Sequence, residues 1–138
     1  MYDKVLVAVD HSEVSGRALA AARDLALLSK GQVWVLHLRE REVVPRMGLV
    51  PTEEEPDAES EVRAAVDELT AAGVTAHGVI RDCIFGHAAH EIIDDAREHQ
   101  ADVIVMGSRG RGDLAGLVLG STAHKVIHLA DRPVLVVR

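Results

Sequence analysis

Short hydrophobic runs alternate along the chain with segments in which hydrophobic residues recur at helical spacing. Runs such as KVLVAVD at 4–10 and ADVIVM at 101–106 predict strands that are buried on both faces of a sheet. Between these runs the hydrophobic residues recur every three or four positions, which predicts helices. The predicted strands are 4–10, 32–39, 75–81, 101–106 and 132–137, and the predicted helices are 13–30, 58–72, 86–99 and 121–130.

The alternation of strands with helices predicts an α/β fold, because a parallel strand pair needs a crossover that a helix supplies. Right-handed, short connections favour an open five-stranded parallel sheet of order 3-2-1-4-5 with helices on both faces, as in a Rossmann-like fold. No internal repeat is present, and we expect a single domain over residues 1–138. Ligands bind such sheets where the strand order reverses, and there the first and fourth strands lead to Asp10 and Gly107.

The segment from Glu40 to Ser60 departs from this regular pattern. It holds three of the four prolines and the acidic run at 53–55. Proline and charge interrupt regular elements, so the pattern predicts a long loop and assigns no conformation to residues 41–57.

The composition of the chain argues against several classes of function. With 48% hydrophobic and 27% charged residues the chain is of ordinary globular composition. No hydrophobic run approaches the roughly 18 residues of a membrane span, so we expect no membrane partner. The net charge of −7 and the presence of one Phe, one Trp and one Tyr argue against nucleic acid as a partner. A single cysteine and a strand pattern that begins at Lys4 lead us to expect a cytoplasmic protein.

A glycine-rich segment follows the fourth predicted strand. Five of the fourteen residues at 107–120 are glycine, against a usual share of about 7%. Glycine lets backbone N–H groups turn inward, and Ser121 and Thr122 begin a helix whose first N–H groups attract an anion. Arg109 and Arg111 add positive charge. These features fit a polyphosphate cradle, and they fit a surface loop with a helix cap about equally well.

Three familiar motifs do not explain this segment. No GxxxxGK[ST] occurs, which argues against a P-loop kinase or ATPase. Gly110-x-Gly112-x-x-Ala115 matches the looser dinucleotide fingerprint, but it follows the fourth strand, and no acidic residue ends the next one. Residues 111–113 form the Arg-Gly-Asp tripeptide that integrins bind. Because we expect a cytoplasmic protein, which meets no integrin, we attribute this match to chance.

The spacing Gly107-x2-Gly110-x9-Gly120-Ser121 resembles the phosphate loop of the ATP-binding members of the universal stress protein family. The likeness runs along the whole chain, through KVLVAVDHSEVS, VLHL, DVIVMGSRGRG, LGSTAHKVI and PVLVV. It implies a five-stranded parallel α/β sheet, in agreement with the fold predicted from the pattern. It also implies ATP as the ligand, and Mg²⁺ can accompany ATP through the phosphates.

This resemblance implies a set of binding residues. Asp10 would contact adenine or ribose, and Leu38 would lie against the base. Gly107, Arg109 and Gly110 would line the ribose and phosphates, and residues 120–122 would hold the phosphate chain. The complete set is Asp10, Leu38, Met106, Gly107, Arg109, Gly110, Gly120, Ser121 and Thr122.

Two positions depart from the family pattern, and neither removes a phosphate donor. His11 stands where many members have glycine or a small or apolar residue, so the mouth of the pocket would be more crowded. Ala8 stands where a proline can occur. Asp10 itself has a simpler explanation as a turn residue before a helix, with Ser12 as the cap.

The remaining reactive side chains predict no catalytic or metal site. The eight histidines include pairs at 87 and 90 and at 124 and 128, but no third ligand, cysteine pair or HExxH motif accompanies them. We expect these histidines on helix surfaces and no metal held by the protein. Cys83 lies among apolar neighbours and is predicted to be a small buried hydrophobic residue. No catalytic base can be identified.

The last predicted strand, at 132–137, would lie at an edge of the sheet, where unpaired backbone groups invite association. A symmetric pairing of two such strands closes on itself, so we expect a homodimer through the C-terminal strand, as in much of the resembled family. The preferred hypothesis is an ATP-binding regulator of the stress response that signals to an unidentified protein partner. The alternatives are a slow ATPase or phosphotransferase using the same pocket, and a dimeric scaffold without nucleotide.

Overall fold

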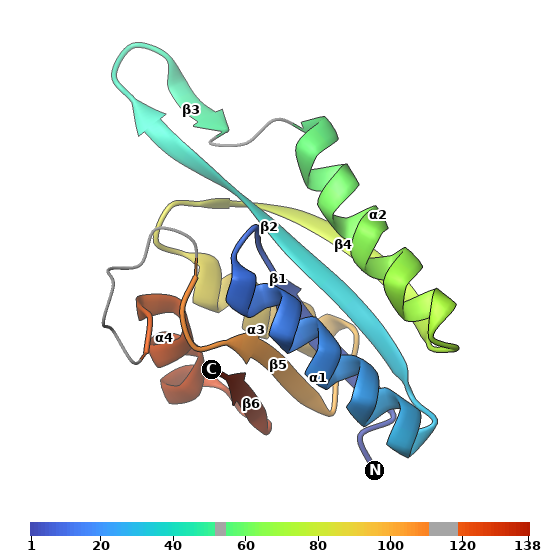
Figure 1. Ribbon diagram of the computed structural model, residues 1–138. Coiled ribbons are helices and arrows are strands. Elements are labelled where there is room, and N and C mark those ends of the chain that lie inside the picture. The colour runs from blue at the N-terminus through green and yellow to red at the C-terminus, as the bar shows by residue number, and fades with distance from the viewer. Residues whose placement is uncertain (52–54, 111–118) are drawn as a thin grey trace.

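The computed structural model describes residues 1–51, 55–110 and 119–138 as a twisted sheet between two layers of helices (Figure 1). Five strands run parallel in the order β4-β2-β1-β5-β6. This is the predicted order 3-2-1-4-5, and the α/β fold class is confirmed. The strands are β1 (Lys4–Val9), β2 (Gln32–Val44), β3 (Gly48–Pro51), β4 (Thr75–Ile84), β5 (Val103–Gly107) and β6 (Val134–Val137).

In the described part of the chain, four helices cover the two faces of the sheet, and side-chain alternation along the strands divides the core between them. Val5 and Val7 of β1 face the cluster formed with α1 and α2, whereas Leu6 faces the cluster formed with α3 and α4. Both faces of the sheet are therefore covered by helices and shielded from solvent, which explains why the central strands are continuously hydrophobic. The helices are α1 (Glu13–Ser29), α2 (Glu55–Ala71), α3 (Ala88–Glu98) and α4 (Ser121–Leu129).

The prediction of a long loop after β2 was wrong, because the chain forms an antiparallel hairpin there. β2 continues to Val44, and β3 pairs with it from Arg41↔Pro51 to Val44↔Gly48. Gly48, the first residue of β3 after the turn, has a φ of 76°, which glycine adopts without strain. The described sheet therefore has six strands where five were predicted, and α2 begins at Glu55, earlier than the predicted residue 58.

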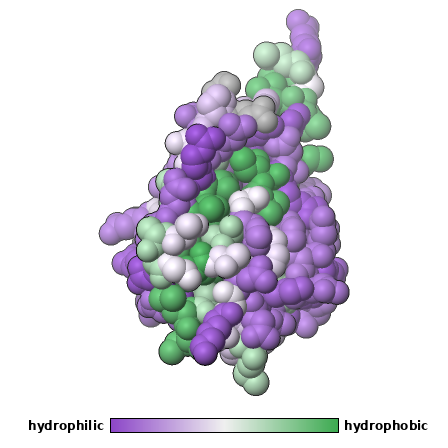
Figure 2. Space-filling view, turned by 90° about the vertical axis from the view of Figure 1, so that its right-hand side faces the viewer, coloured by the Kyte–Doolittle hydropathy of each residue, from purple (hydrophilic) through white to green (hydrophobic). Residues whose placement is uncertain are grey.

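The hairpin protrudes beyond the helices and leaves apolar side chains in contact with solvent. Val43 is 70% exposed and Met47 is 72% exposed. Figure 2 shows hydrophobic residues on the segment that extends at the top of the molecule. Since this hairpin buries little, its sequence lacks the hydrophobic periodicity that identified the other strands.

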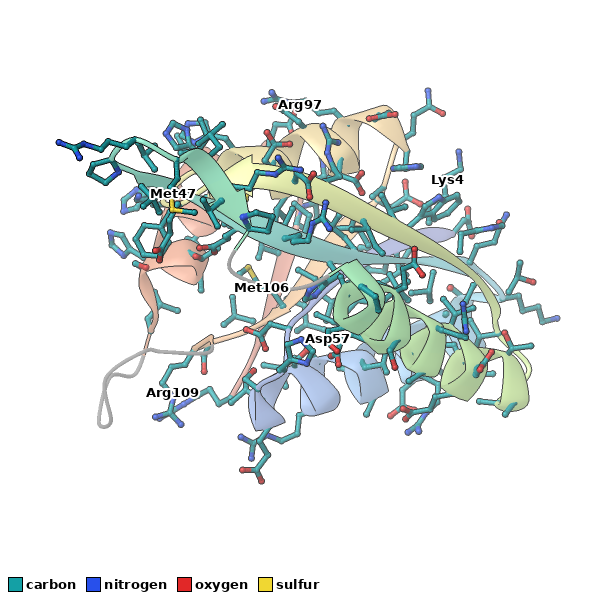
Figure 3. The ribbon with its side chains drawn as sticks, turned by 90° about the horizontal axis from the view of Figure 1, so that it is seen from above. Lys4, Met47, Asp57, Arg97, Met106 and Arg109 are labelled. Carbon is teal, nitrogen blue, oxygen red and sulfur yellow. The ribbon has the colours of Figure 1, made fainter. Side chains whose placement is uncertain are left out.

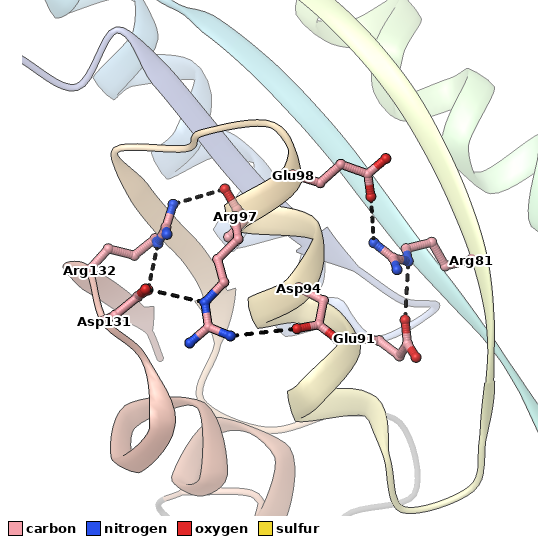
Figure 4. A network of polar contacts seen from close by, with 8 residues as sticks. Arg81, Glu91, Asp94, Arg97, Glu98, Asp131 and Arg132 are labelled. Atoms are coloured by element: carbon pink, nitrogen blue, oxygen red, sulfur yellow. Dashed lines mark hydrogen bonds and ion pairs between the residues drawn. The ribbon is translucent and has the colours of Figure 1, made fainter.

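Ion pairs on both sides of α3 hold this helix against the sheet (Figure 4). On one side, the Arg81 guanidinium from β4 contacts Glu91 Oε2 at 3.1 Å and the buried Asp95 Oδ1 at 3.2 Å. On the other side, Asp131 lies between Arg97 and Arg132, at 3.2 and 2.9 Å. The position of α3 matters because its first turns form one wall of the pocket described next.

Candidate functional site

A pocket opens at the carboxyl ends of β1, β2 and β5, at the predicted reversal of strand order. Strands and helix starts surround it: β1 and its turn into α1, the outer part of β2, the first turns of α3, the segment after β5, and the beginning of α4. The lining residues are Ala8, Val9, Asp10, Ser12, Ser15, Leu36, Leu38, Glu40, Ala88, Ile92, Met106, Gly107, Ser108, Arg109, Gly110, Gly120, Thr122 and Ala123.

The structure brings most of the predicted site residues to this pocket. The predicted residues that line it are Asp10, Leu38, Met106, Gly107, Arg109, Gly110, Gly120 and Thr122. In the view from above, Met106 lies near the centre of the molecule and Arg109 toward its margin (Figure 3). Ser121 is exposed and is absent from the lining. Arg111 and the motif residues at 112–115 lie outside the described residues.

The turn from β1 into α1 is built by three polar side chains. Asp10 Oδ1 accepts the Ser12 N–H at 2.7 Å, and Ser15 Oγ accepts the Asp10 N–H at 2.8 Å. Ser12 Oγ in turn caps α1 by accepting the Ser15 N–H at 3.2 Å. Asp10 is thus a turn residue, as its simpler explanation predicts, and it also lines the pocket at the switch point.

Two segments that lie apart in the sequence meet at Ser108. Its N–H donates to the Val137 carbonyl at 2.7 Å, and its carbonyl accepts the Gly120 N–H at 2.6 Å. The buried Ser108 therefore ties β6 and the start of α4 to the end of β5. Sequence analysis missed this residue because its role uses backbone atoms, which any residue type provides.

The N-terminus of α4 offers hydrogen-bond donors to the pocket. Its cap residue Gly120 has no side chain that could accept from the first N–H groups, whereas Ser12 Oγ caps α1. The first N–H groups of a helix have no partner within the helix, and the helix dipole adds partial positive charge there. With Arg109 also on the lining, this end of the pocket favours an anion.

The opposite end of the pocket is largely apolar and is formed by β2 and α3. β1 pairs with β2 only as far as Val9↔His37, so residues 38–40 of β2 extend past the end of β1. Leu36, Leu38 and Glu40 alternate along the strand onto the same face and line the pocket with Ile92. Burial, and next the nearby Glu42 carboxylate, raise the pKa of Glu40.

Sequence analysis also missed Glu40, because the predicted second strand ended at residue 39. Had the strand been extended by the period of two that relates 36 to 38, Glu40 would have joined the pocket-facing set. The buried His37 lies on the other face of β2, where its Nδ1 contacts the Val9 carbonyl at 2.9 Å. Its ring lies 5.5 Å from that of His11, which lines an adjoining cavity beside α2 that shares Val9, Asp10, Ser12 and Ser15 with the pocket.

Elsewhere, the reactive side chains form no second centre among the described residues. The rings of His124 and His128 lie 4.6 Å apart, and those of His87 and His90 lie 6.3 Å apart. Within residues 1–51, 55–110 and 119–138, no cluster of three or more His, Cys, Asp or Glu side chains could hold a metal ion. Cys83 is buried, as predicted, and burial raises its pKa to about 11.

No helix in the described part of the chain is long and apolar enough to cross a membrane.

The chain is similar to known proteins along nearly its whole length. The universal stress protein YxiE of Bacillus subtilis is 35% identical in an alignment 151 residues long, gaps included, that covers 100% of this chain and 100% of the relative. A solved structure of MJ0577 from Methanocaldococcus jannaschii superposes with a TM-score of 0.81 at 27% identity, covering 99% of this chain and 96% of that chain. A universal stress protein from Archaeoglobus fulgidus, solved in complex with dAMP, superposes with a TM-score of 0.76 at 27% identity and covers 99% and 98% of the two chains.

The family model agrees with these relatives. The Usp model, described as the universal stress protein family, matches residues 1–138. The match includes every described strand and helix of the fold. The chain therefore belongs to the universal stress protein family.

Proposed function

We propose that this protein binds an adenine nucleotide, with ATP as the preferred ligand, in the pocket at the carboxyl ends of β1, β2 and β5. The single observation that supports this most directly is the division of the pocket into an apolar end at β2 and a donor-rich end at β5 and α4. A nucleotide has the same division, with a flat base at one end and phosphates at the other. The dAMP complex of the Archaeoglobus fulgidus relative supports the same class of ligand.

In this proposal the base lies against Leu38 and Met106, and the ribose lies near Asp10. The phosphates receive hydrogen bonds from the segment after Gly107 and from the first turn of α4, and Arg109 adds positive charge. The donors present at that end suit phosphate oxygens. Mg²⁺ would reach the site with ATP, since this ion is usually held through substrate phosphates.

We further propose that the protein is a cytoplasmic, nucleotide-dependent regulator of the stress response that acts as a homodimer. β6 pairs with β5 on one side, and Leu135 on this strand is 41% exposed. A second copy of the strand would cover that edge. The one cysteine in the chain fits a reducing compartment. Binding itself, transmitted to an unidentified protein partner, would be the regulatory event.

Equilibrium binding by calorimetry tests the proposed ligand. Wild-type protein should bind ATP, and Gly120→Val should abolish binding because a branched Cβ would enter the space beside the first turn of α4. Gly16→Val is the matched control, because a Cβ on Gly16 meets nothing within 4 Å and this residue does not line the pocket. Equal ATP affinities for the two variants would contradict the proposal.

Two additional measurements separate the alternatives. Steady phosphate release from ATP and Mg²⁺ that is lost in Gly120→Val would favour the slow ATPase. Absence of adenine nucleotide in the denatured supernatant of fresh protein, together with no rise in Tm on adding ATP, would favour the scaffold. Tight ATP binding without turnover would support the regulator.

A further inference from the structure

We propose that the imidazoles of His124 and His128 on α4 bind a divalent transition-metal ion such as Zn²⁺, with water molecules as its remaining ligands. The site is separate from the proposed nucleotide pocket, because neither residue belongs to the described lining of that pocket. The spacing of four residues is visible in the sequence, but the distance between the two rings is not. A site with two protein ligands is compatible with the finding that the described ranges hold no cluster of three or more ligating side chains.

The packing of α4 turns both histidines toward solvent. This helix lies at the margin of the molecule (Figure 1). Ala123 and Val126 are 2% and 0% exposed and pack into the core between the helices and the sheet. His124 and His128 are exposed. Residues four apart on a helix are neighbours on one face, so a single ion from solvent can reach both rings.

The two rings have nearly the separation that a shared ion requires. Their centres lie 4.6 Å apart, and their planes are inclined at 67°. Two imidazoles bound to one tetrahedral ion, through nitrogens about 2.0–2.1 Å from it, have ring centres about 5 Å apart. Small rotations of the two side chains are therefore enough to direct one nitrogen of each ring at a common point.

The histidine pair at the start of α3 has a different geometry. The ring centres of His87 and His90 lie 6.3 Å apart, which is farther than one shared ion allows. His87 is the cap residue before α3, so only His90 lies within the helix. This second exposed pair is consequently a natural control for the pair on α4.

In the part of the chain that the structure describes, no protein group competes for the ring nitrogens of His124 and His128. The two rings contact each other, and neither makes a hydrogen bond or an ion pair there. The ammonium group of Lys125 lies 3.4 Å from the Gly86 carbonyl oxygen and is directed toward the start of α3. His128 lies in the last turn of α4, where the helix dipole favours a cation, and the net charge of −7 also attracts one.

The ligand atoms determine which class of ion binds. Imidazole nitrogen suits Zn²⁺, Cu²⁺ and Ni²⁺, whereas Mg²⁺ and Ca²⁺ prefer oxygen ligands. In metalloproteases, two histidines four residues apart on a helix bind zinc, and the glutamate after the first histidine acts as a general base. Lys125 follows His124 in this chain. We therefore expect the site to bind the ion without catalysing hydrolysis.

Calorimetric titration of tag-free, nucleotide-free protein with zinc chloride tests the proposal. Wild-type protein should bind one Zn²⁺ with a Kd of about 100 µM or tighter, since two ligands supply roughly half of the binding free energy of a four-ligand site. His124→Ala and His128→Ala should each weaken binding at least about tenfold, because each removes one of the two ligands. Both positions are exposed and alanine favours helices, so the metal-free variants should keep the wild-type Tm.

The double variant His87→Ala/His90→Ala is the matched control and should keep the wild-type Zn²⁺ affinity within about threefold. Magnesium chloride should give no binding in the same concentration range. A weaker wild-type Kd, a smaller loss in either α4 variant, an equal loss in the control variant, or equal binding of Mg²⁺ would each overturn the proposal. The titration contains no nucleotide, so all of these results would leave the proposed function standing.

Discussion

Gly107, the last residue of β5, packs against the side chain of Val14 in the first turn of α1. A Cβ added to Gly107 would lie 2.6 Å from Val14 Cγ1 and 3.2 Å from the Arg109 carbonyl oxygen. A contact of 2.6 Å is too short for carbon atoms, so the close approach of strand and helix requires glycine. The resemblance assigned Gly107 to the nucleotide, but the structure gives it a separate packing role.

Gly107→Ala should lower the free energy of unfolding by about 1–3 kcal/mol, the usual cost of overpacking a well-filled site. Val14 is a branched residue with little rotamer freedom in a helix, so it cannot move aside cheaply. Urea denaturation of the single variants and of Gly107→Ala/Val14→Ala checks this account. The double variant should be more stable than the sum of the single effects predicts, and strict additivity would contradict the contact.

Arg81→Met should lower the free energy of unfolding by about 3 kcal/mol, because it removes the guanidinium from a buried carboxylate and leaves it only His99, whose Nδ1 lies 3.3 Å from Asp95 Oδ2. Asp95 is 1% exposed, and its Oδ1 lies 3.2 Å from Arg81 Nη1. Arg97→Met provides the comparison, since Arg97 and its partner Asp131 are both about half exposed, and exposed ion pairs contribute at most about 1 kcal/mol. Chemical denaturation should rank the two variants in this order, and a reversed order would refute the explanation.

Asp82 should make stability depend on pH in the acid range. Hydrogen bonds from Arg39 and then from Arg41 lower the pKa of Asp82 from 3.8 to about 2. A lowered pKa in the folded state stabilises the protein fully above 3.8, and this contribution disappears as the pH falls toward 2.

The Tm of Asp82→Asn should therefore lie below that of the wild type at pH 5, and the difference should shrink between pH 4 and pH 2. Differential scanning calorimetry over this range checks the prediction. A difference that stays constant with pH would show that the ionisation of Asp82 contributes nothing.

Leu135→Arg should shift the protein from dimer to monomer, if the edge of β6 joins two copies as proposed. A charge at the centre of a four-residue strand would oppose its own symmetry mate and discourage pairing. Light scattering coupled to gel filtration measures the mass directly. Leu28→Arg, at an 85% exposed position on α1, is the control and should leave the mass unchanged.

The parts of the fold that bury hydrophobic surface could be predicted from the sequence, and the exposed part could not. Val5, Val7 and Val33 lie in runs with no polar interruption because both faces of their strands are covered. Val43 and Leu49 pair across the hairpin, but they are 70% and 48% exposed. A strand pair without a buried face has no constraint on its pattern, so prolines and charges around it indicated a loop.

The site was predictable where backbone geometry demands a residue type. Asp10 and Gly107 followed from the reversal of strand order, and the glycine spacing pointed to Gly110 and Gly120, which also line the pocket. Glu40 and Ser108 could not be found in this way. Glu40 reaches the pocket because β2 continues past its predicted end, and Ser108 acts through its backbone amide and carbonyl. Neither role requires a particular residue type, so the sequence pattern does not indicate it.

The Ser108 bridge also ties the edge of the sheet to the pocket. Val137 at the end of β6 and Gly120 at the start of α4 are joined through a single residue, at 2.7 and 2.6 Å. Fraying of the last strand would remove the acceptor of the Ser108 N–H, and the residue whose carbonyl holds the first turn of α4 would then lose one of its two backbone links. The edge strand thus supports the same residue that positions the start of α4.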